Sequence, residues 1–279
     1  EDLNLILAAR GIVIFPNFQH QKKINIMSNT VLITGATSGI GLACAKMFAK
    51  NGFNLILTGR RKERLEKLES ELAIEYMVKV KSCSFDIRDK DSVFDAIDKL
   101  VADGHSIDIL INNAGLASGL NSVQEGDIDD WEKMIDTNIK GLLYISRAVL
   151  PMMIERKQGH IINIGSIAGK EVYPNGNVYC GTKHAVDAIT KGMRIDAVQY
   201  GVRVSQIAPG AVETEFSVVR FHGDKEKADN VYKGFEPLLA EDVADAVYYV
   251  ANTPKHVNIN DLVIMPTAQA AAAIIHKNT

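Results

Sequence analysis

The chain has 279 residues, of which 47% are hydrophobic and 23% charged, so it can bury one substantial core and we expect a single domain. Its formal net charge of -3 gives no general attraction to nucleic acid or to an anionic membrane, and we expect neither as a partner. The three cysteines, Cys44, Cys83 and Cys180, show no CxxC spacing, which favours a reducing compartment, the cytoplasm, and argues against structural zinc.

The first residues of the chain do not read as part of the functional domain. Residues 1–26 hold two short apolar pieces, but they begin with two acidic residues and lack the basic region and cleavage site of a secretory signal. Met27 reads as a natural start directly before the first strand. We therefore expect residues 1–26 to be an extension that the native protein need not have, and residues 27–279 to form the domain.

Seven apolar runs alternate with stretches long enough for helices. Continuous apolar runs are typical of strands buried on both faces, and crossover helices between them imply a parallel sheet. The sequence therefore predicts one α/β domain, a doubly wound Rossmann-type fold with a seven-stranded parallel sheet. The predicted strands are residues 30–35, 54–59, 80–85, 107–112, 160–165, 202–210 and 261–265.

The segment "TGATSGIG", residues 34–41, lies between the first strand and a helix. At this location backbone amides and the helix dipole can receive a pyrophosphate, and Gly35, Gly39 and Gly41 permit the tight turn and the close approach. The segment predicts a dinucleotide site. A turn with a purely structural role is the alternative.

The second strand ends in "LTGRR", where Gly59 leaves no carboxylate to repel the extra phosphate of NADP. Arg60 can bind that phosphate in two places, so we expect NADP as the cofactor. The alternative is that Arg60 and Arg61 have no role in binding and are solvated residues at the start of a charged helix. This alternative suits Arg61 better than Arg60.

The segment "YCGTK" sets Tyr179 and Lys183 four residues apart, on one face of a predicted helix. A nearby ammonium favours the phenolate form of a tyrosine, so we expect Tyr179 to exchange a proton with an alcohol or carbonyl. Ser166 follows a predicted strand at the carboxyl edge of the sheet, where its hydroxyl can hold the substrate oxygen. Alone, this spacing is more often a surface tyrosine and a solvated lysine.

The ordered motifs "TGATSGIG", "NNAG", "DTNIKG", "YCGTK" and "APG" over residues 30–265 resemble the short-chain dehydrogenase/reductase family. The resemblance implies a proton-transfer tetrad of Asn138, Ser166, Tyr179 and Lys183, without a metal, and a homotetramer. It also implies an adenine site at Asp86 and Ile87 and a carboxamide site at Val212 and Thr214. With the motif residues above, the expected cofactor site comprises Gly35, Thr37, Ser38, Gly39, Ile40, Gly41, Arg60, Arg61, Asp86, Ile87, Asn113, Ala114, Gly115, Tyr179, Lys183, Pro209, Gly210, Val212 and Thr214.

The segment after "APG", which includes "EFSVVRFHGDKEK", is similar to the family branch that oxidises 3-hydroxy acids such as serine and allo-threonine with NADP. We expect Arg220 to bind the substrate carboxylate and its apolar neighbours to exclude water. The equally weighted alternative is that Arg220 is solvated on the segment or lies in a subunit interface. Lys170 and Tyr173 are weaker candidates for the substrate pocket.

Two other functions remain open. The first is an NADPH-dependent reductase of another carbonyl, such as a 3-oxoacyl thioester, a sugar or a pterin, although "LVIMPT" lacks the "DGG" common in acyl-carrier-protein reductases. The second is an NADP-sensing binding module, which the complete tetrad opposes because cofactor binding alone does not require Tyr179 and Ser166. The small 3-hydroxy acid remains the expected substrate.

Overall fold

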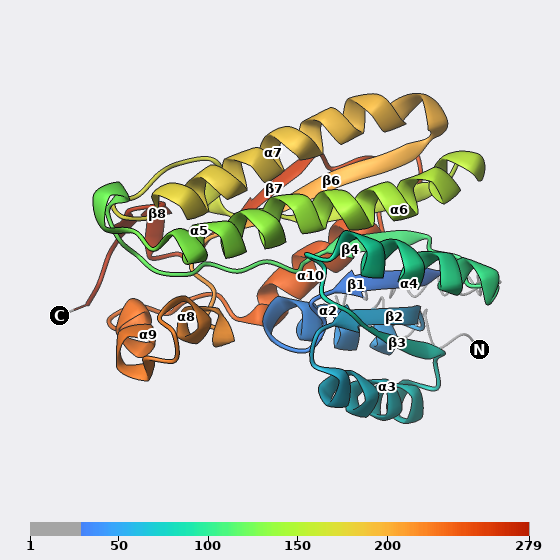
Figure 1. The fold of residues 1–279 in the computed structure, drawn as a ribbon, viewed down its shortest axis with the longest axis horizontal. Helices are drawn as coiled ribbons and strands as arrows, with labels where there is room; N and C mark the ends of the chain where they lie inside the picture. The colour runs from blue at the N-terminus through green and yellow to red at the C-terminus, as the bar shows by residue number, and fades with distance from the viewer. Residues whose placement is uncertain (1–28, 279) are drawn as a thin grey trace, which may run out of the picture.

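The structure is a computed structural model that describes residues 29–278, and the extension expected at residues 1–26 lies outside these residues. Seven parallel strands form one sheet in the order β3-β2-β1-β4-β5-β6-β7, as the doubly wound prediction requires (Figure 1). The strands are β1 (Thr30–Thr34), β2 (Asn54–Gly59), β3 (Val80–Ser84), β4 (Ile109–Asn112), β5 (Gly159–Ile164), β6 (Val202–Pro209) and β7 (Asp261–Ile264).

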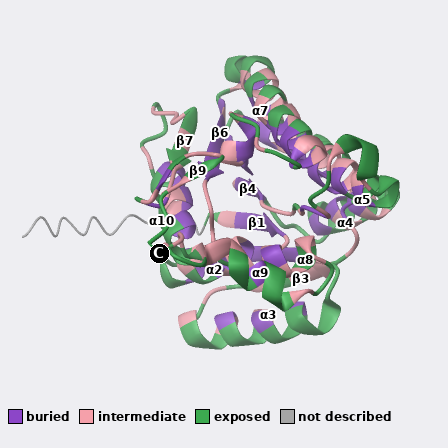
Figure 2. Ribbon diagram, turned by 90° about the vertical axis from the view of Figure 1, so that its left-hand side faces the viewer, coloured by how far each residue is buried: buried purple, intermediate pink, exposed green. Residues whose placement is uncertain are grey.

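Helices cover both faces of this sheet, and each face has its own apolar core (Figure 2). One face is packed by α2 (Gly39–Lys50), α3 (Lys62–Tyr76) and α10 (Ala240–Ala251). The other is packed by α4 (Lys90–Ala102), α6 (Leu142–Glu155) and α7 (Asn177–Ala197). The strands are therefore buried on both sides, which is why their sequences are continuous apolar runs. None of the helices in residues 29–278 has the length and apolarity needed to cross a membrane.

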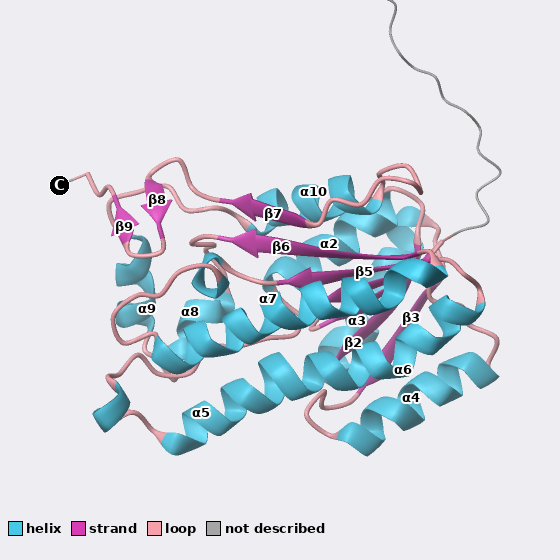
Figure 3. Cartoon of the chain, turned by 90° about the horizontal axis from the view of Figure 1, so that it is seen from above, coloured by secondary structure: helices cyan, strands magenta, loops and turns pink. Residues whose placement is uncertain are grey.

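The carboxyl ends of the parallel strands meet at one edge of the sheet (Figure 3). The short helices α8 (Glu215–Arg220) and α9 (Lys225–Tyr232) lie at this edge, beside a two-stranded ribbon of β8 (Gln269–Ala271) and β9 (Ile274–Ile275). Residues 211–234, which contain α8 and α9, are called the lid below. The segment after "APG" thus contains two helices, each started by a side-chain cap, from Thr214 and Asp224.

The seven predicted strands are confirmed to within two residues at each end. The apolar stretch from Trp131 to Met153 is not one continuous α-helix. It runs through α5 (Ile128–Ile135), a π-helical turn at Asp136–Gly141 and α6. Such wider turns are frequent at functional sites, and this one carries Asn138.

Candidate active site

A cavity of about 520 Å³ lies at the carboxyl edge of the sheet, between the strand ends, the lid and the β8–β9 ribbon. It brings together most of the residues that the sequence indicated, from segments far apart in the chain. The predicted residues that line it are Gly35, Thr37, Ser38, Gly39, Ile40, Arg60, Arg61, Asp86, Ile87, Asn113, Ala114, Gly115, Ser166, Tyr173, Tyr179, Lys183, Pro209, Gly210, Val212, Thr214 and Arg220.

The glycine-rich loop has the shape that a pyrophosphate needs. Gly35 and Gly39 take left-handed backbone angles, with φ of 66° and 51°. A Cβ atom on Gly35 would lie 3.0 Å from the Cα atom of Ala114, so a side chain at this position would press against the backbone of the segment after β4. Ser38, at the start of α2, makes no side-chain cap, which leaves the first amides of the helix to an anion. These residues fit a dinucleotide cofactor.

Gly41 and Asn138 do not line the cavity but lie directly behind it. A Cβ atom on Gly41 would lie 2.4 Å from the Gly35 carbonyl oxygen, so Gly41 lets α2 pack against the loop. The Asn138 side chain bridges two elements: its oxygen accepts from the Leu116 amide at 2.9 Å, and its nitrogen donates to the Thr182 hydroxyl at 3.0 Å. Asn138 therefore joins the segment after β4 to α7, the helix that carries Tyr179 and Lys183.

Arg61 has the stronger contacts of the two arginines after β2. Its guanidinium donates to the Thr37 hydroxyl at 2.6 and 2.9 Å, and to the Ser38 hydroxyl at 2.7 Å. It also forms an ion pair with Glu215 of the lid at 3.0 Å. The prediction that a solvated role suits Arg61 better than Arg60 is wrong, because Arg61 turns back onto the glycine-rich loop.

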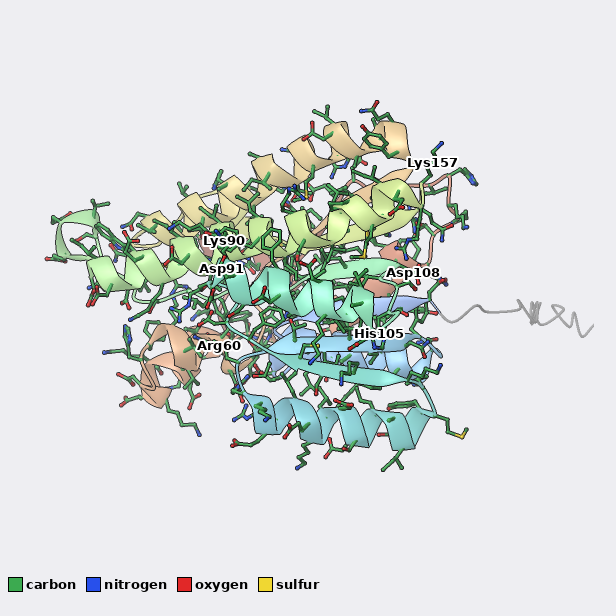
Figure 4. The ribbon with its side chains drawn as sticks, turned by 45° about the vertical axis from the view of Figure 1, so that its right-hand side comes forward. Arg60, Lys90, Asp91, His105, Asp108 and Lys157 are labelled. Carbon is green, nitrogen blue, oxygen red and sulfur yellow. The ribbon has the colours of Figure 1, made fainter. Side chains whose placement is uncertain are left out.

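Arg60 lines the same end of the cavity with a looser arrangement. Its side chain is 61% exposed, and its guanidinium lies 3.8 Å from the carboxylate of Asp86. Figure 4 places Arg60 at the end of the sheet near the lid, whereas Asp108 and Lys157 lie at the opposite end. Hydrogen bonds from Arg88 lower the pKa of Asp86, so this carboxylate is ionised beside Arg60. Both arginines follow the end of β2 and line the cavity, so both guanidinium groups can bind a phosphate there.

Tyr179, Ser166 and Lys183 meet at the inner end of the cavity. Tyr179 and Lys183 project from one face of α7 and are almost fully buried. Ser166 lies two residues after β5, and its hydroxyl accepts a hydrogen bond from the Ala168 amide at 3.0 Å. The Lys183 ammonium donates to the Ile164 carbonyl at 2.9 Å, which fixes the lysine against the end of β5.

Burial dominates the protonation of this cluster. It raises the pKa of Tyr179 well above its usual range, while a hydrogen bond with Ser166 and the positive charge of Arg220 oppose the rise. Burial lowers the pKa of Lys183 to about 8. The cation that opposes the rise is therefore the guanidinium of Arg220, and not the Lys183 ammonium that the sequence suggested. Because burial is the largest effect, it favours the neutral phenol of Tyr179.

Arg220 reaches from the last turn of α8 into the cavity. Its guanidinium carbon lies 5.5 Å from the Tyr173 ring centre and 5.6 Å from the Tyr179 ring centre. Nη2 donates to the Tyr173 hydroxyl at 2.9 Å and Nε to the Gly119 carbonyl at 3.3 Å. Within residues 29–278, the guanidinium makes only these two hydrogen bonds, and neither of them uses Nη1. The guanidinium thus retains donors for an anion beside the tyrosine hydroxyl.

Lys170 does not belong to the cavity. Its ammonium forms ion pairs with Asp187 and Asp261. Burial opposes protonation, but these two carboxylates raise the pKa of Lys170 above its usual value. The prediction of Lys170 as a pocket candidate is wrong because two acids hold it outside the cavity.

Phe216 and Val219, two of the apolar neighbours of Arg220 that were expected to exclude water, line the cavity. Phe216 packs edge-on to the Tyr179 ring with 5.7 Å between ring centres, which shields the tyrosine from water. The last residues of the chain carry no motif, so nothing in their sequence indicated that they return to the site. The lining residues that were missed from the sequence include Val231, Tyr232, Gln269, Ala272 and Ile275.

Comparison with known proteins finds relatives along almost the whole chain. The profile of the family described as short chain dehydrogenase matches residues 29–225. Sulfoacetaldehyde reductase 2 of Chromohalobacter salexigens is 48% identical over 248 residues, which cover 88% of this chain and 98% of that protein. The NADP-dependent 3-hydroxy acid dehydrogenase YdfG of Salmonella typhi is 47% identical over 250 residues, covering 89% and 99%. A closed form of serine dehydrogenase complexed with NADP+ superposes with a TM-score of 0.84 at 45% identity, covering 90% and 100%.

Proposed function

Because the chain belongs to the short-chain dehydrogenase family, we propose that it is an NADP-dependent oxidoreductase that interconverts a small 3-hydroxy acid and its 3-oxo form. The observation that carries the substrate class is Arg220, a cation with unused donors against the ring of the proton-transferring Tyr179. A carboxylate on those donors would set the substrate's 3-oxygen toward the Tyr179 hydroxyl.

When bound, NADP supplies the hydride acceptor for oxidation or the hydride donor for reduction. In the reduction, the Tyr179 phenol gives its proton to the carbonyl oxygen, and in the oxidation its phenolate removes the hydroxyl proton. Ser166 donates a hydrogen bond to the same oxygen and stabilises its developing charge. Lys183, which is held to the Ile164 carbonyl and lines the same cavity, would bind the ribose hydroxyls on the nicotinamide half of the cofactor. Phe216 packs against the Tyr179 ring and excludes water. Because burial raises the pKa of Tyr179, the neutral form is ready for the reduction.

The test is a panel of substrates with both cofactors. We expect NADP+ turnover of 3-hydroxypropionate, 3-hydroxyisobutyrate, serine and allo-threonine, and much weaker turnover of uncharged alcohols of the same size. A reductase of 3-oxoacyl thioesters, sugars or pterins would act on its uncharged substrates instead. Activity confined to such substrates would reject the proposed class.

A second candidate is the reduction of a small aldehyde that carries a sulfonate. It is favoured by the 48% identity to a protein named sulfoacetaldehyde reductase 2 and by the chemistry of Arg220, since a guanidinium binds a sulfonate through the same donors as a carboxylate. Adding sulfoacetaldehyde and its carboxylate counterpart, malonate semialdehyde, to the panel separates the two. A higher kcat/KM for the sulfonate would select the second candidate.

We propose that Arg61 and Arg60 together select NADP by binding its extra phosphate. Replacing Arg61 with alanine is expected to raise the KM for NADP+ about tenfold or more and to leave the KM for NAD+ nearly unchanged, because one charge-assisted contact is lost. Arg60→Ala should have a smaller effect, since its side chain is more exposed. The two KM values, measured at fixed substrate, check this. Lys62→Ala, in the first turn of α3 and paired only with Glu66 in the described residues, is the control.

We also propose a single domain over residues 27–279, a cytoplasmic location and a homotetramer. Support for a reducing location comes from Cys44, Cys83 and Cys180, which are free thiols in the described chain. Exposed apolar side chains on α6 and α7, including Leu143 and Ile195, favour contact with another subunit. Light scattering coupled to size-exclusion chromatography measures the assembly directly, and a monomer at micromolar concentration would reject the tetramer.

A further inference from the structure

The middle of the lid, between α8 and α9, is fastened to α5 by a polar cluster outside the cavity, centred on Asp130. This residue is only 4% exposed. Its carboxylate accepts from the Ser118 hydroxyl at 2.7 Å, contacts the His222 imidazole Nε2 at 3.0 Å and lies 3.5 Å from the Lys133 ammonium. Ser118 belongs to the segment after β4, and His222 follows α8 directly. One buried carboxylate therefore joins three separate parts of the chain.

Backbone geometry is arranged around this contact. His222 has a left-handed φ of 53°, a conformation that is unfavourable for a residue with a side chain, and it turns the imidazole toward Asp130. Gly119 is also left-handed, and a Cβ atom there would lie 3.0 Å from the Asp130 carboxylate. A side chain at position 119 would therefore push the carboxylate away. The left-handed backbone of His222 costs conformational free energy, and we infer that the packing of the lid and the contact with Asp130 offset this cost.

The cluster lies next to the residue that faces the substrate. Gly119 and Arg220 bind each other twice: the Gly119 amide donates to the Arg220 carbonyl at 2.9 Å, and the Arg220 Nε donates to the Gly119 carbonyl at 3.3 Å. Ser118 directly precedes Gly119, and His222 lies two residues after Arg220; both contact the Asp130 carboxylate. The backbone and the guanidinium of Arg220 are thus both hydrogen-bonded to Gly119. The residue before it, Ser118, is hydrogen-bonded to Asp130.

A second, smaller hollow of about 10 Å³ lies beside the cluster, lined by Arg220 and Tyr179 together with Ser118, Asp130 and Asn177. This space is about the size of one water molecule, so it cannot take the guanidinium. Contacts that fix Arg220 therefore act on how firmly its guanidinium is held in the cavity, and so mainly on binding of the substrate anion.

We infer that Asp130 and His222 are positioning residues that latch the lid so that Arg220 presents its free donors to the anionic group of the substrate. The inference rests on the proposed function, in which Arg220 binds that anion. It assigns specificity for anionic substrates to a contact outside the cavity wall, and it leaves proton transfer to Tyr179.

The test compares an acid with its uncharged ester in three variants, Asp130→Asn, His222→Asn and the double variant. Asparagine suits position 222 because it tolerates left-handed backbone, while its shorter side chain loses the contact with Asp130. For each single variant we expect the KM for 3-hydroxypropionate to rise about tenfold. The KM values for its methyl ester and for NADP+ should stay within about twofold of wild type. Any fall in kcat should be equal for acid and ester, because a displaced Arg220 charge lowers the pKa of Tyr179 less.

A latch made by the pair predicts that the double variant is no worse than either single variant. Additive increases in KM, or equal increases for the acid and the ester, would overturn the inference. Lys225→Asn is the matched control, because Lys225 is an exposed lid residue three positions from His222 and should behave as wild type. If Asp130→Asn does not fold, His222→Asn carries the comparison, since its side chain is 60% exposed.

A second measurement is independent of the substrate. In the NADP+ complex of the full chain, we expect the amides of residues 216–222 to exchange with deuterium about tenfold faster in both single variants than in wild type or Lys225→Asn. Unchanged exchange would reject the latch even if the KM values moved. Conversely, a wild-type protein that does not oxidise hydroxy acids would reject the proposed function, and faster exchange in the variants would then still establish the latch.

Discussion

Replacing Tyr179 with phenylalanine is expected to lower kcat about 10²- to 10⁴-fold in both directions, the range over which a positioned acid or base contributes to catalysis. Phenylalanine preserves the edge-on packing against Phe216, because only the hydroxyl is lost. The affinity for NADP+ and the melting temperature should therefore change little. Single-turnover kinetics, with cofactor binding followed by fluorescence, separates loss of chemistry from loss of binding.

Tyr173 provides the control within the same cavity. Its hydroxyl accepts a hydrogen bond from Arg220, and burial raises its pKa as burial does for Tyr179. Tyr173→Phe removes this contact without touching the proposed proton transfer, so kcat should fall far less than for Tyr179→Phe. If both variants lost kcat equally, or if Tyr179→Phe retained most of its activity, the assignment of Tyr179 as the proton-transfer residue would be rejected.

The sheet and most of the cavity could be predicted because their signals are local. Strands such as β1 and β5 are buried on both faces, so their sequences are unbroken apolar runs. In a parallel sheet the strand ends meet at one edge, so Gly35, Ser166 and Tyr179 could be placed together from their positions relative to the strands.

Other features depend on tertiary contacts that no local pattern encodes. The π-helical turn at Asn138 inserts one wider turn into a stretch that reads as ordinary helix. Arg61 was undervalued because Thr37 and Ser38, its acceptors, are more than 20 residues away in the sequence. The return of Gln269 to the Ala211 amide, at 2.8 Å, brings the tail into the cavity wall without any motif.

Replacing Arg220 with glutamine is expected to lower kcat/KM for 3-hydroxy acids about 10- to 150-fold, the range of one to two lost charge-assisted hydrogen bonds. Glutamine keeps part of the stem and can still donate to Tyr173, so the lid should stay folded. The methyl ester of the same acid has no anion to bind, and its KM should be unchanged. The ratio of kcat/KM for acid and ester should therefore fall toward one.

The same substitution has a second effect, which differs in its dependence on pH. The Arg220 charge lowers the pKa of Tyr179 against the larger effect of burial, so its loss raises that pKa further. The phenolate that oxidation needs becomes rarer at a given pH, and kcat for oxidation should fall for acid and ester alike and recover as the pH rises. Arg220→Lys retains a charge but not the two-point contact, so it should restore more of kcat than of the acid preference. An unchanged acid-to-ester ratio in Arg220→Gln would mean that Arg220 does not bind the substrate anion.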